Sequence, residues 1–238
     1  MESKKVKVLF MRHGYSISNY HQASRPKEKY KWDPELIDCT LHPRGEEECK
    51  AATKIINAQI KLKYVIVSPL IRARQTAILV TSTYPTMLKF YVHPLLREMV
   101  YQSNDIPSEF RMLPSEACSL KYFPESDDKY YNIRGLKYES ELLKKYSSCS
   151  MKEFEKRIAA KMCMLSPVYL ESKEDFSGRV EGFIGFLNDF IKSHNAVDGE
   201  LLVITHSQFI HAVRRIFHIK SGHVKNCSIT ELDVQINK

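Results

Sequence analysis

The sequence predicts an α/β fold, because short apolar runs of strand length alternate with segments of helical periodicity. The first run is Val6–Met11, and similar runs follow at Tyr64–Val67, Phe90–Val92 and Leu201–Ile204. Continuous apolar runs are typical of strands that are buried on both faces of a parallel sheet. A last run, Cys227–Val234, alternates apolar and polar residues and is predicted as the final strand.

Helices are predicted between these strands. Acidic residues open the segment Glu46–Ile60, which suits the positive end of a helix dipole. Another helix is predicted with Ser68 as its cap and Pro69 at its first position. Ser177–His194 carries a broad apolar stripe, and a helix over Gln208–His218 follows the fourth strand.

Composition limits the class of protein and its surroundings. The chain has 238 residues, enough for one large domain or two small ones. A net charge of +8 favours anionic ligands, but the lysines are scattered and no zinc-finger, basic-zipper or RNA-recognition pattern occurs, so we expect no nucleic-acid partner.

Cysteine usage and hydropathy indicate the compartment. The six cysteines form no Cys-x-x-Cys pair and have irregular spacings, which favours reduced thiols over a disulfide framework. No signal-peptide pattern and no run of 18 apolar residues occurs. We therefore expect a cytoplasmic protein that contacts no membrane.

The first strand leads directly into Arg12, His13 and Gly14. In open α/β sheets, ligands bind at the carboxyl ends of the strands. An arginine there offers a fork of donors for an oxyanion, and a histidine can act as nucleophile, acid or base. Taken alone, His13 fits a hydrogen-bonded loop histidine equally well.

Charged residues also follow the other predicted strands. Arg72 lies in the first turn of the helix after Tyr64–Val67, and Arg74 points in another direction, so one is expected at the site and the other in solvent. Glu98 follows the third strand and is either a general acid or a surface carboxylate. His206 lies at a strand-to-helix turn, where anions bind readily, or is a structural turn histidine.

Two segments are predicted mainly as loops. The polar stretch that follows Gly14 contains Ser16 and Asn19, which either bond within a turn or contact a ligand. Residues 99–178 carry no strong strand signal, and their helical patterns include Ser140–Tyr146 and Met151–Leu165. Within them, residues 111–138 interleave basic residues with tyrosines, which fits a lid or insertion over the site, a solvated surface or a nucleic-acid surface.

Together these residues suit a phosphoryl group. Two arginines can bind its equatorial oxygens, His13 can attack phosphorus in line, and Glu98 can protonate the leaving oxygen. His206 can help to neutralise the developing charge, so no metal is required. Metal ligation by His13, Glu98 and His206 is the competing interpretation, and the adjacent arginines oppose it because they would repel a divalent cation.

These motifs resemble the histidine phosphatase superfamily, in its phosphoglycerate mutase-like branch. The resemblance is carried by Arg12-His13-Gly14, Leu41-x-x-x-Gly45, Ser68-Pro69-Leu70-x-Arg72-Ala73-x-Gln75-Thr76, Leu95-Leu96-Arg97-Glu98, Thr205-His206 and Asn226–Leu232. It implies a three-layer α/β/α sandwich with a mostly parallel central sheet. The chain would be a single domain, residues 1–238, with a helical and loop insertion over the site at roughly residues 99–178.

The resemblance also implies the roles of the site residues. His13 would be the phosphorylated nucleophile and Glu98 the proton donor. The phosphate pocket would be formed by Arg12, Arg72 and His206, with Asn19 as a further contact. Ser16 is a weaker candidate for substrate binding, and Ser207 stands where the family commonly has glycine and can still present its amide.

Departures from the family pattern favour a phosphatase over a mutase. Similar mutases usually carry Glu where this chain has Tyr15, and Met99–Ser103 replaces their substrate-binding stretch. We therefore expect a metal-independent, cofactor-free phosphomonoester hydrolase that acts on a small-molecule phosphoester or a phosphoprotein. The alternatives are a phosphoglycerate mutase, an isomerase that would need bisphosphoglycerate, and a non-catalytic phospho-binding scaffold. A homodimer is also possible.

Overall fold

A six-stranded sheet forms the centre of the molecule. The computed structural model describes residues 4–31, 33–59, 61–106, 120–122, 171–220 and 222–236. Its strands are β1 (Lys4–Arg12), β2 (Tyr64–Val67), β3 (Lys89–Val92), β4 (Leu120–Tyr122), β5 (Leu201–Thr205) and β6 (Ile229–Ile236). Their order across the sheet is β4-β3-β2-β5-β1-β6, and only β6 runs antiparallel to its neighbour.

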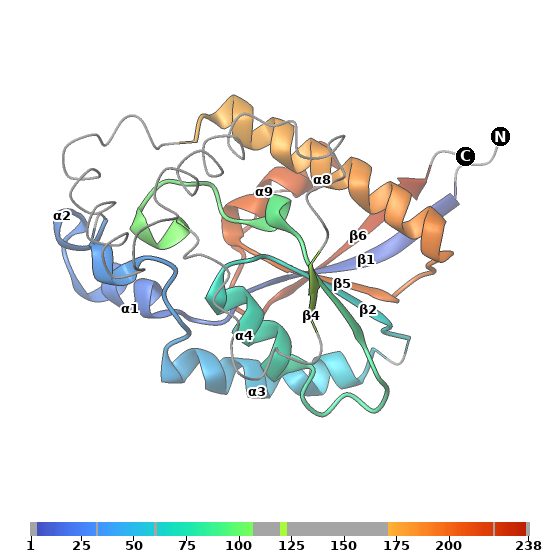
Figure 1. Ribbon diagram of the computed structural model, residues 1–238, viewed down its shortest axis with the longest axis horizontal. Helices are drawn as coiled ribbons and strands as arrows, with labels where there is room; N and C mark the ends of the chain where they lie inside the picture. Colours follow the sequence, from blue (N-terminus) through green and yellow to red (C-terminus); the bar gives the residue numbers. More distant parts are fainter. Residues whose placement is uncertain are drawn as a thin grey trace.

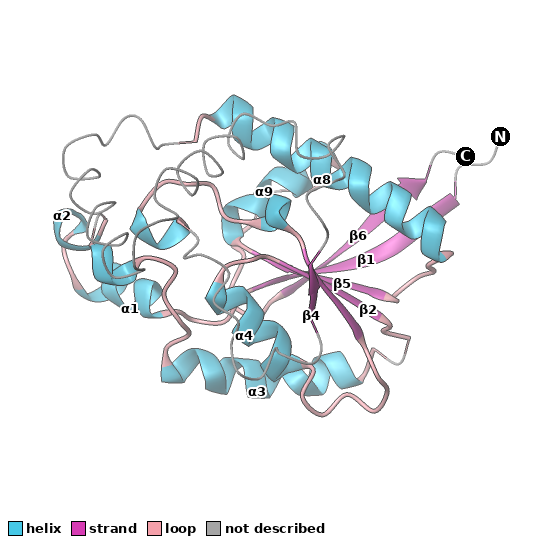
Figure 2. Ribbon diagram, viewed as in Figure 1, coloured by secondary structure: helices cyan, strands magenta, loops and turns pink. Residues whose placement is uncertain are grey.

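Helices cover both faces of this sheet (Figure 1). The helices are α1 (Ile17–Ser24), α2 (Lys27–Tyr30), α3 (Pro43–Asn57), α4 (Ile71–Val80), α8 (Lys173–His194) and α9 (Ser207–Ile216). Figure 2 shows α3 and α4 on one face of the sheet and α8 and α9 on the other. The predicted three-layer α/β/α sandwich with a mostly parallel sheet is therefore confirmed.

Alternation along the strands divides the apolar core between the two faces. In β1, Val8 and Phe10 pack with the side chains of α8 and α9, whereas Leu9 and Met11 pack with those of α3 and α4. Successive side chains of a strand point to opposite faces, so a strand covered on both sides must be apolar throughout. This requirement explains the unbroken apolar runs that predict the strands.

Three helices begin earlier or later than the sequence predicts. The first, α3, begins at Pro43 rather than Glu46, because the His42 side chain caps it by accepting from the Arg44 amide at 3.2 Å, and it ends at Asn57. At the other face, α8 begins at Lys173 rather than Ser177, because Ser172 accepts from the Asp175 amide. The last helix, α9, spans Ser207–Ile216 rather than Gln208–His218.

The predicted start of α4 is wrong for a reason that involves the site. Pro69 is not helical, and α4 begins at Ile71 with an extended Leu70 before it. The Ser68 hydroxyl bonds to the His206 ring instead of capping, and the Ile71 amide donates to Asp38 at 2.8 Å. Tertiary contacts thus replace the local cap.

Most of the predicted insertion, residues 99–178, lies outside the described residues, as do the predicted helices Ser140–Tyr146 and Met151–Leu165. Two described elements lie within this segment. Strand β4 falls inside this segment and pairs in parallel with β3, and the first turn of α8 belongs to the helical layer. The remaining described part holds the short helix η3 (Ser103–Asp105).

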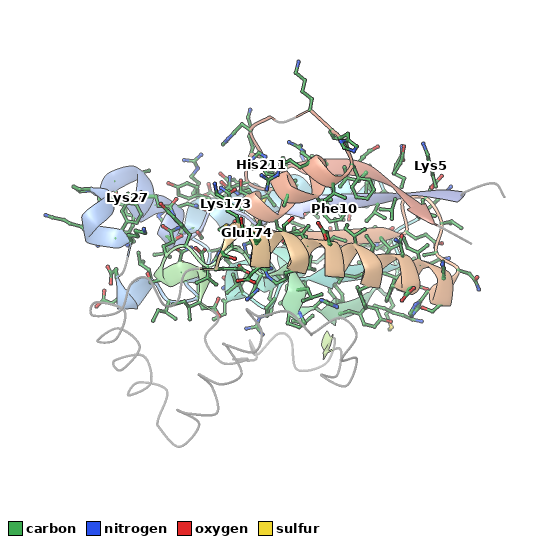
Figure 3. The ribbon with its side chains drawn as sticks, turned by 90° about the horizontal axis from the view of Figure 1, so that it is seen from above. Lys5, Phe10, Lys27, Lys173, Glu174 and His211 are labelled. Carbon is green, nitrogen blue, oxygen red and sulfur yellow. The ribbon has the colours of Figure 1, made fainter. Side chains whose placement is uncertain are left out.

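The strand β1 points its carboxyl end toward α1 and α2. In Figure 3, Lys5 on β1 and Lys27 on α2 lie at opposite ends of the molecule, with Phe10 between them. The residues that follow β1, β2 and β5 therefore meet at one edge of the sheet. Among the helices that the structure describes, none combines the length and the apolar character that crossing a membrane requires.

Candidate active site

The main chain around His13 is fixed by segments that are far apart in the sequence. The His13 amide donates to the Thr205 carbonyl at 3.0 Å, which extends the pairing of β1 with β5. Asn226 donates to the His13 carbonyl at 2.8 Å. The Gly14 amide donates to the hydroxyl of Thr76 on α4 at 2.9 Å. The position of the His13 backbone is therefore set by β5, α4 and the loop before β6.

The His13 ring is held in one tautomer. Its Nδ1 lies 2.7 Å from the Gly14 carbonyl, which can only accept, so Nδ1 carries the hydrogen. Nε2 accepts from Arg72 Nε at 3.3 Å and therefore holds the lone pair. Burial, Arg72 and Arg12 place the pKa of His13 well below its usual value. The result is a neutral imidazole with a basic nitrogen beside a guanidinium group.

His206 lies next to His13, with their ring centroids 5.0 Å apart. It follows β5, is fully buried, and its Nε2 lies 2.7 Å from the Ser68 hydroxyl. Its Nδ1 has no hydrogen-bond partner among the described residues. Burial and the nearby Arg72 lower the pKa of His206 well below its usual value. The Ser68 hydroxyl occupies Nε2, which leaves Nδ1 for a further partner.

Arg72 bridges His13 and the short helix η3. Besides its bond to the His13 ring, it donates to the Asn104 carbonyl and to Asp105 Oδ1, the latter at 3.3 Å. Burial raises the pKa of Asp105 to about 7, although Arg72 opposes the rise. The sequence pattern contains no signal that points to Asp105, which comes to the site only through the fold.

The predicted division between Arg72 and Arg74 is wrong. Both side chains are buried, each with an exposed fraction of 1%. The cause is that α4 is covered on most sides, with seven of its ten residues buried. Neither arginine therefore points into solvent.

Glu98 lies in the segment after β3, beside the first turn of α9. Its two carboxyl oxygens accept from the Met99 amide at 2.9 Å and from the Gln208 amide at 3.2 Å. Burial raises the pKa of Glu98, while these two bonds and the nearby arginines Arg12 and Arg72 partly offset the rise. A carboxyl group with a raised pKa holds its proton closer to neutral pH, as a general acid must.

Arg12 joins this group from the end of β1. It is half-buried, donates from Nη1 to the Val224 carbonyl at 2.8 Å, and has no partner for Nε among the described residues. Burial lowers the pKa of its guanidinium, and the charge of Glu98 acts in the opposite direction. Arg12, Arg72, His13, His206 and Glu98 thus meet at one edge of the sheet, as the sequence predicts.

The weaker candidates have mixed outcomes. Ser16 is fully buried and caps α1, exchanging hydrogen bonds with Asn19, which is the turn role considered for it. Asn19 Oδ1 also accepts from Asn226 at 3.4 Å, which places Asn19 next to the His13 loop. Ser207 is the first residue of α9 and is half-buried.

Two residues at the site have roles that the sequence does not predict. Thr76 lies at the end of the motif Ser68–Thr76, and its hydroxyl ties Gly14 to α4. Arg179 on α8 binds the carbonyls of the loop that carries Glu98. Its signal in the sequence is an arginine on an otherwise apolar helix face, between Phe176 and Phe183.

The grouping differs from a metal centre. Among the described residues, no three His, Cys, Asp or Glu side chains lie together as the ligands of an ion. The two arginines and the unpartnered Nδ1 of His206 can instead bind an anion, while His13 Nε2 offers a nucleophilic lone pair. This arrangement can bind a tetrahedral oxyanion and transfer it to a ring nitrogen.

Solved structures share the fold across nearly the whole chain. A candidate alpha-ribazole-5'-P phosphatase from Escherichia coli K-12 matches with 18% identity and a TM-score of 0.56, covering 96% of this chain and 90% of its own. A mycobacterial glucosyl-3-phosphoglycerate phosphatase complexed with VO3 matches with 17% identity and a TM-score of 0.53, covering 95% and 90%. At these identities the likeness establishes the fold alone.

A search of curated proteins gave no match. The family comparison is more specific, because residues 8–110 match the model of the histidine phosphatase superfamily, branch 1. That segment contains Arg12, His13, Arg72 and Glu98, four of the five residues that the fold brings together. Over residues 8–110 the chain is therefore similar to the histidine phosphatase superfamily (branch 1).

Proposed function

We propose that the protein hydrolyses phosphomonoesters without a metal, through a phosphohistidine on His13. The observation that carries the proposal is the tautomer of His13, with Nδ1 bonded to Gly14 and Nε2 facing Arg72. A nucleophilic imidazole must be neutral and must present its lone pair to phosphorus. The lowered pKa of His13 supports that state at neutral pH.

In the first step, His13 Nε2 attacks phosphorus and the bond from phosphorus to the ester oxygen breaks. Glu98 donates its proton to that oxygen, and the alcohol leaves. Arg12, Arg72 and His206 donate hydrogen bonds to the phosphoryl oxygens, where charge develops in the transition state.

In the second step, the Glu98 carboxylate takes a proton from a water molecule, which attacks the phosphohistidine. The nitrogen–phosphorus bond breaks, inorganic phosphate leaves, and His13 and Glu98 return to their starting states. The same carboxyl group thus acts first as acid and then as base.

The substrate class follows from the chemistry of the site: a phosphate monoester on a small molecule or a protein. The structural neighbours favour a small molecule, because they are named as phosphatases of alpha-ribazole-5'-P and of glucosyl-3-phosphoglycerate. The free, buried thiols Cys39, Cys49 and Cys227 support a reducing compartment such as the cytoplasm.

The second candidate function is that of a bisphosphoglycerate-dependent mutase. Tyr15 and Met99–Ser103 argue against it, because they replace residues that similar mutases carry.

The test is phosphate release from a panel of phosphomonoesters with EDTA present. We expect hydrolysis that EDTA does not reduce, and a phosphoenzyme that is labile in acid and stable in alkali. His13→Ala should abolish both, whereas the matched variant His211→Ala, on the half-exposed side of α9, should retain them. Hydrolysis by His13→Ala at the wild-type rate would refute the phosphohistidine. Isomerisation of phosphoglycerate that requires bisphosphoglycerate would favour the mutase.

A further inference from the structure

Arg179 is a fully buried arginine on the inner face of α8. It lies between Phe176 and Phe183, which both belong to the apolar core. An arginine is almost never fully buried unless its charge and its donors are satisfied. Its partners therefore indicate what it holds in place.

The partners of Arg179 include the backbone of the loop that carries Glu98. Nη1 donates to the Leu95 carbonyl at 2.7 Å and to the Arg97 carbonyl at 2.8 Å, and Nη2 lies 3.3 Å from the Glu98 carbonyl. One guanidinium group thus bonds three carbonyls within four consecutive residues, across more than 80 positions of sequence.

Glu171 holds Arg179 and also contacts the same loop. Its oxygens accept from Arg179 Nε at 2.8 Å and Nη2 at 2.6 Å. Its carboxylate also accepts from the Val100 amide at 3.3 Å, and its own amide donates to the Val100 carbonyl at 3.2 Å. Burial alone would raise the pKa of Glu171, but Arg179 and Arg97 hold it below its usual value.

These contacts fix the chain on both sides of Glu98. Its carboxyl oxygens are bound by backbone amides, those of Met99 and Gln208, so the place of the carboxyl group depends on the place of the loop. A general acid must lie within hydrogen-bond reach of the leaving oxygen, and an error of about 1 Å can cost about 10²-fold in rate.

We propose that Arg179, held by Glu171, is the positioning residue for the carboxyl group of Glu98. The proposal rests on the proposed function, in which Glu98 protonates the leaving oxygen. Lysine cannot replace the arginine, because an ammonium group lacks the planar fork that reaches several carbonyls and a carboxylate together.

The test separates positioning from folding by the choice of leaving group. An alkyl phosphate needs its leaving oxygen protonated, whereas p-nitrophenyl phosphate has a good leaving group and needs little help from an acid. The quantity to compare is kcat/KM, because it reports the first chemical step even where release of phosphate from His13 limits kcat.

The variants are Arg179→Lys, the reference Glu98→Gln and the control Ile56→Ala. Ile56 is fully buried in α3 on the opposite face of the sheet, so its truncation destabilises the fold without touching the acid loop. We expect Arg179→Lys to lose at least about tenfold in kcat/KM for the alkyl phosphate and less than about threefold for p-nitrophenyl phosphate, a part of the 10²–10⁴ that acid catalysis provides. Ile56→Ala should lower both values equally or neither.

The positioning role would be overturned if Arg179→Lys lowered kcat/KM by the same factor for the two substrates, as is expected of Ile56→Ala. If Arg179→Lys does not fold, Glu171→Gln is the second variant: it keeps the acceptor for Val100, and the same unequal loss is expected. If Glu98→Gln itself shows no difference between the substrates, the role of Glu98 in the proposed function is wrong. If Glu98→Gln shows the difference and the Arg179 and Glu171 variants do not, only the inference about Arg179 is wrong.

Discussion

A methyl group added at Gly45 would test how closely the start of α3 packs against the loop that carries His13. An ideal Cβ at Gly45 would lie 2.0 Å from the Tyr15 carbonyl oxygen and 2.8 Å from the carbonyl carbon and the amide nitrogen of Tyr15. These atoms are backbone and cannot rotate away. The Tyr15 oxygen also accepts from the His42 amide at 3.0 Å, so it is held from the same side.

The magnitude follows from these distances. A carbon and a carbonyl oxygen approach to about 3.3 Å at closest, so the Tyr15 oxygen or α3 must move by about 1.3 Å. Replacing glycine by alanine in a helix stabilises it by about 1 kcal/mol, but overpacking of this kind costs about 1–3 kcal/mol or more. We expect Gly45→Ala to be destabilising on balance. Because Tyr15 is two residues from His13, we also expect kcat/KM to fall by about 10²-fold.

The assay combines urea unfolding with kcat/KM for a phosphomonoester. The matched control is Gly178→Ala, which makes the same substitution at an exposed position of α8 where a Cβ meets nothing within 4 Å. The free energy of unfolding of that variant should rise by about 0.5–1 kcal/mol, and its kcat/KM should not change. The close packing would be refuted by a Gly45→Ala variant as stable and as active as the wild type.

Three further predictions concern the site and its surroundings. Ser68→Ala should lower kcat/KM by about tenfold, because it removes the hydrogen bond that orients His206. Ser68→Thr keeps the hydroxyl and should retain most of the wild-type kcat/KM. Burial lowers the pKa of His93 to about 3 in the folded protein. As the pH drops below 6.5, the unfolded chain therefore binds a proton at His93 that the folded protein does not, and the free energy of unfolding falls. Between pH 7 and pH 5, urea unfolding should show a decrease in this free energy that is about 2 kcal/mol smaller in His93→Asn than in the wild type. Sulfate is a dianion throughout this pH range. It should inhibit several-fold more weakly as the pH rises through 7, because Asp105 then ionises beside Arg72. The same pH dependence of sulfate inhibition in Asp105→Asn would contradict this.

Where local pattern and tertiary structure agree, the sequence predicts the fold closely. Strand Tyr64–Val67 has the predicted bounds, because it is buried on both faces and bounded by polar residues. Positions set by tertiary contacts are predicted poorly. The start of α4 differs because Ser68 serves His206 rather than the helix, and Arg74 is buried because its helix is enclosed.

The same distinction applies to the site. Arg12, His13, Arg72, Glu98 and His206 follow strands or open a helix, so their convergence can be predicted from strand order alone. The contacts that hold them come from residues without a motif of their own. Asp105 contacts Arg72 from the short helix η3, and Arg179 contacts the Glu98 carbonyl from a helix more than 80 residues away. Local sequence patterns do not predict contacts over such separations.

The place of β1 in the sheet has a consequence for the synthesis of the chain. Both neighbours of β1 come from the last part of the sequence, with Leu9 paired to Leu202 and Val6 to Val234. At about 5–20 residues per second, a ribosome needs about 10–40 s to make the roughly 190 residues that separate β1 from β5. During that time the apolar residues of β1 have neither strand partner, and His13 lacks its bonds to Thr205 and Asn226. The loop that carries the nucleophile is thus translated roughly 190 residues before the strand that completes it.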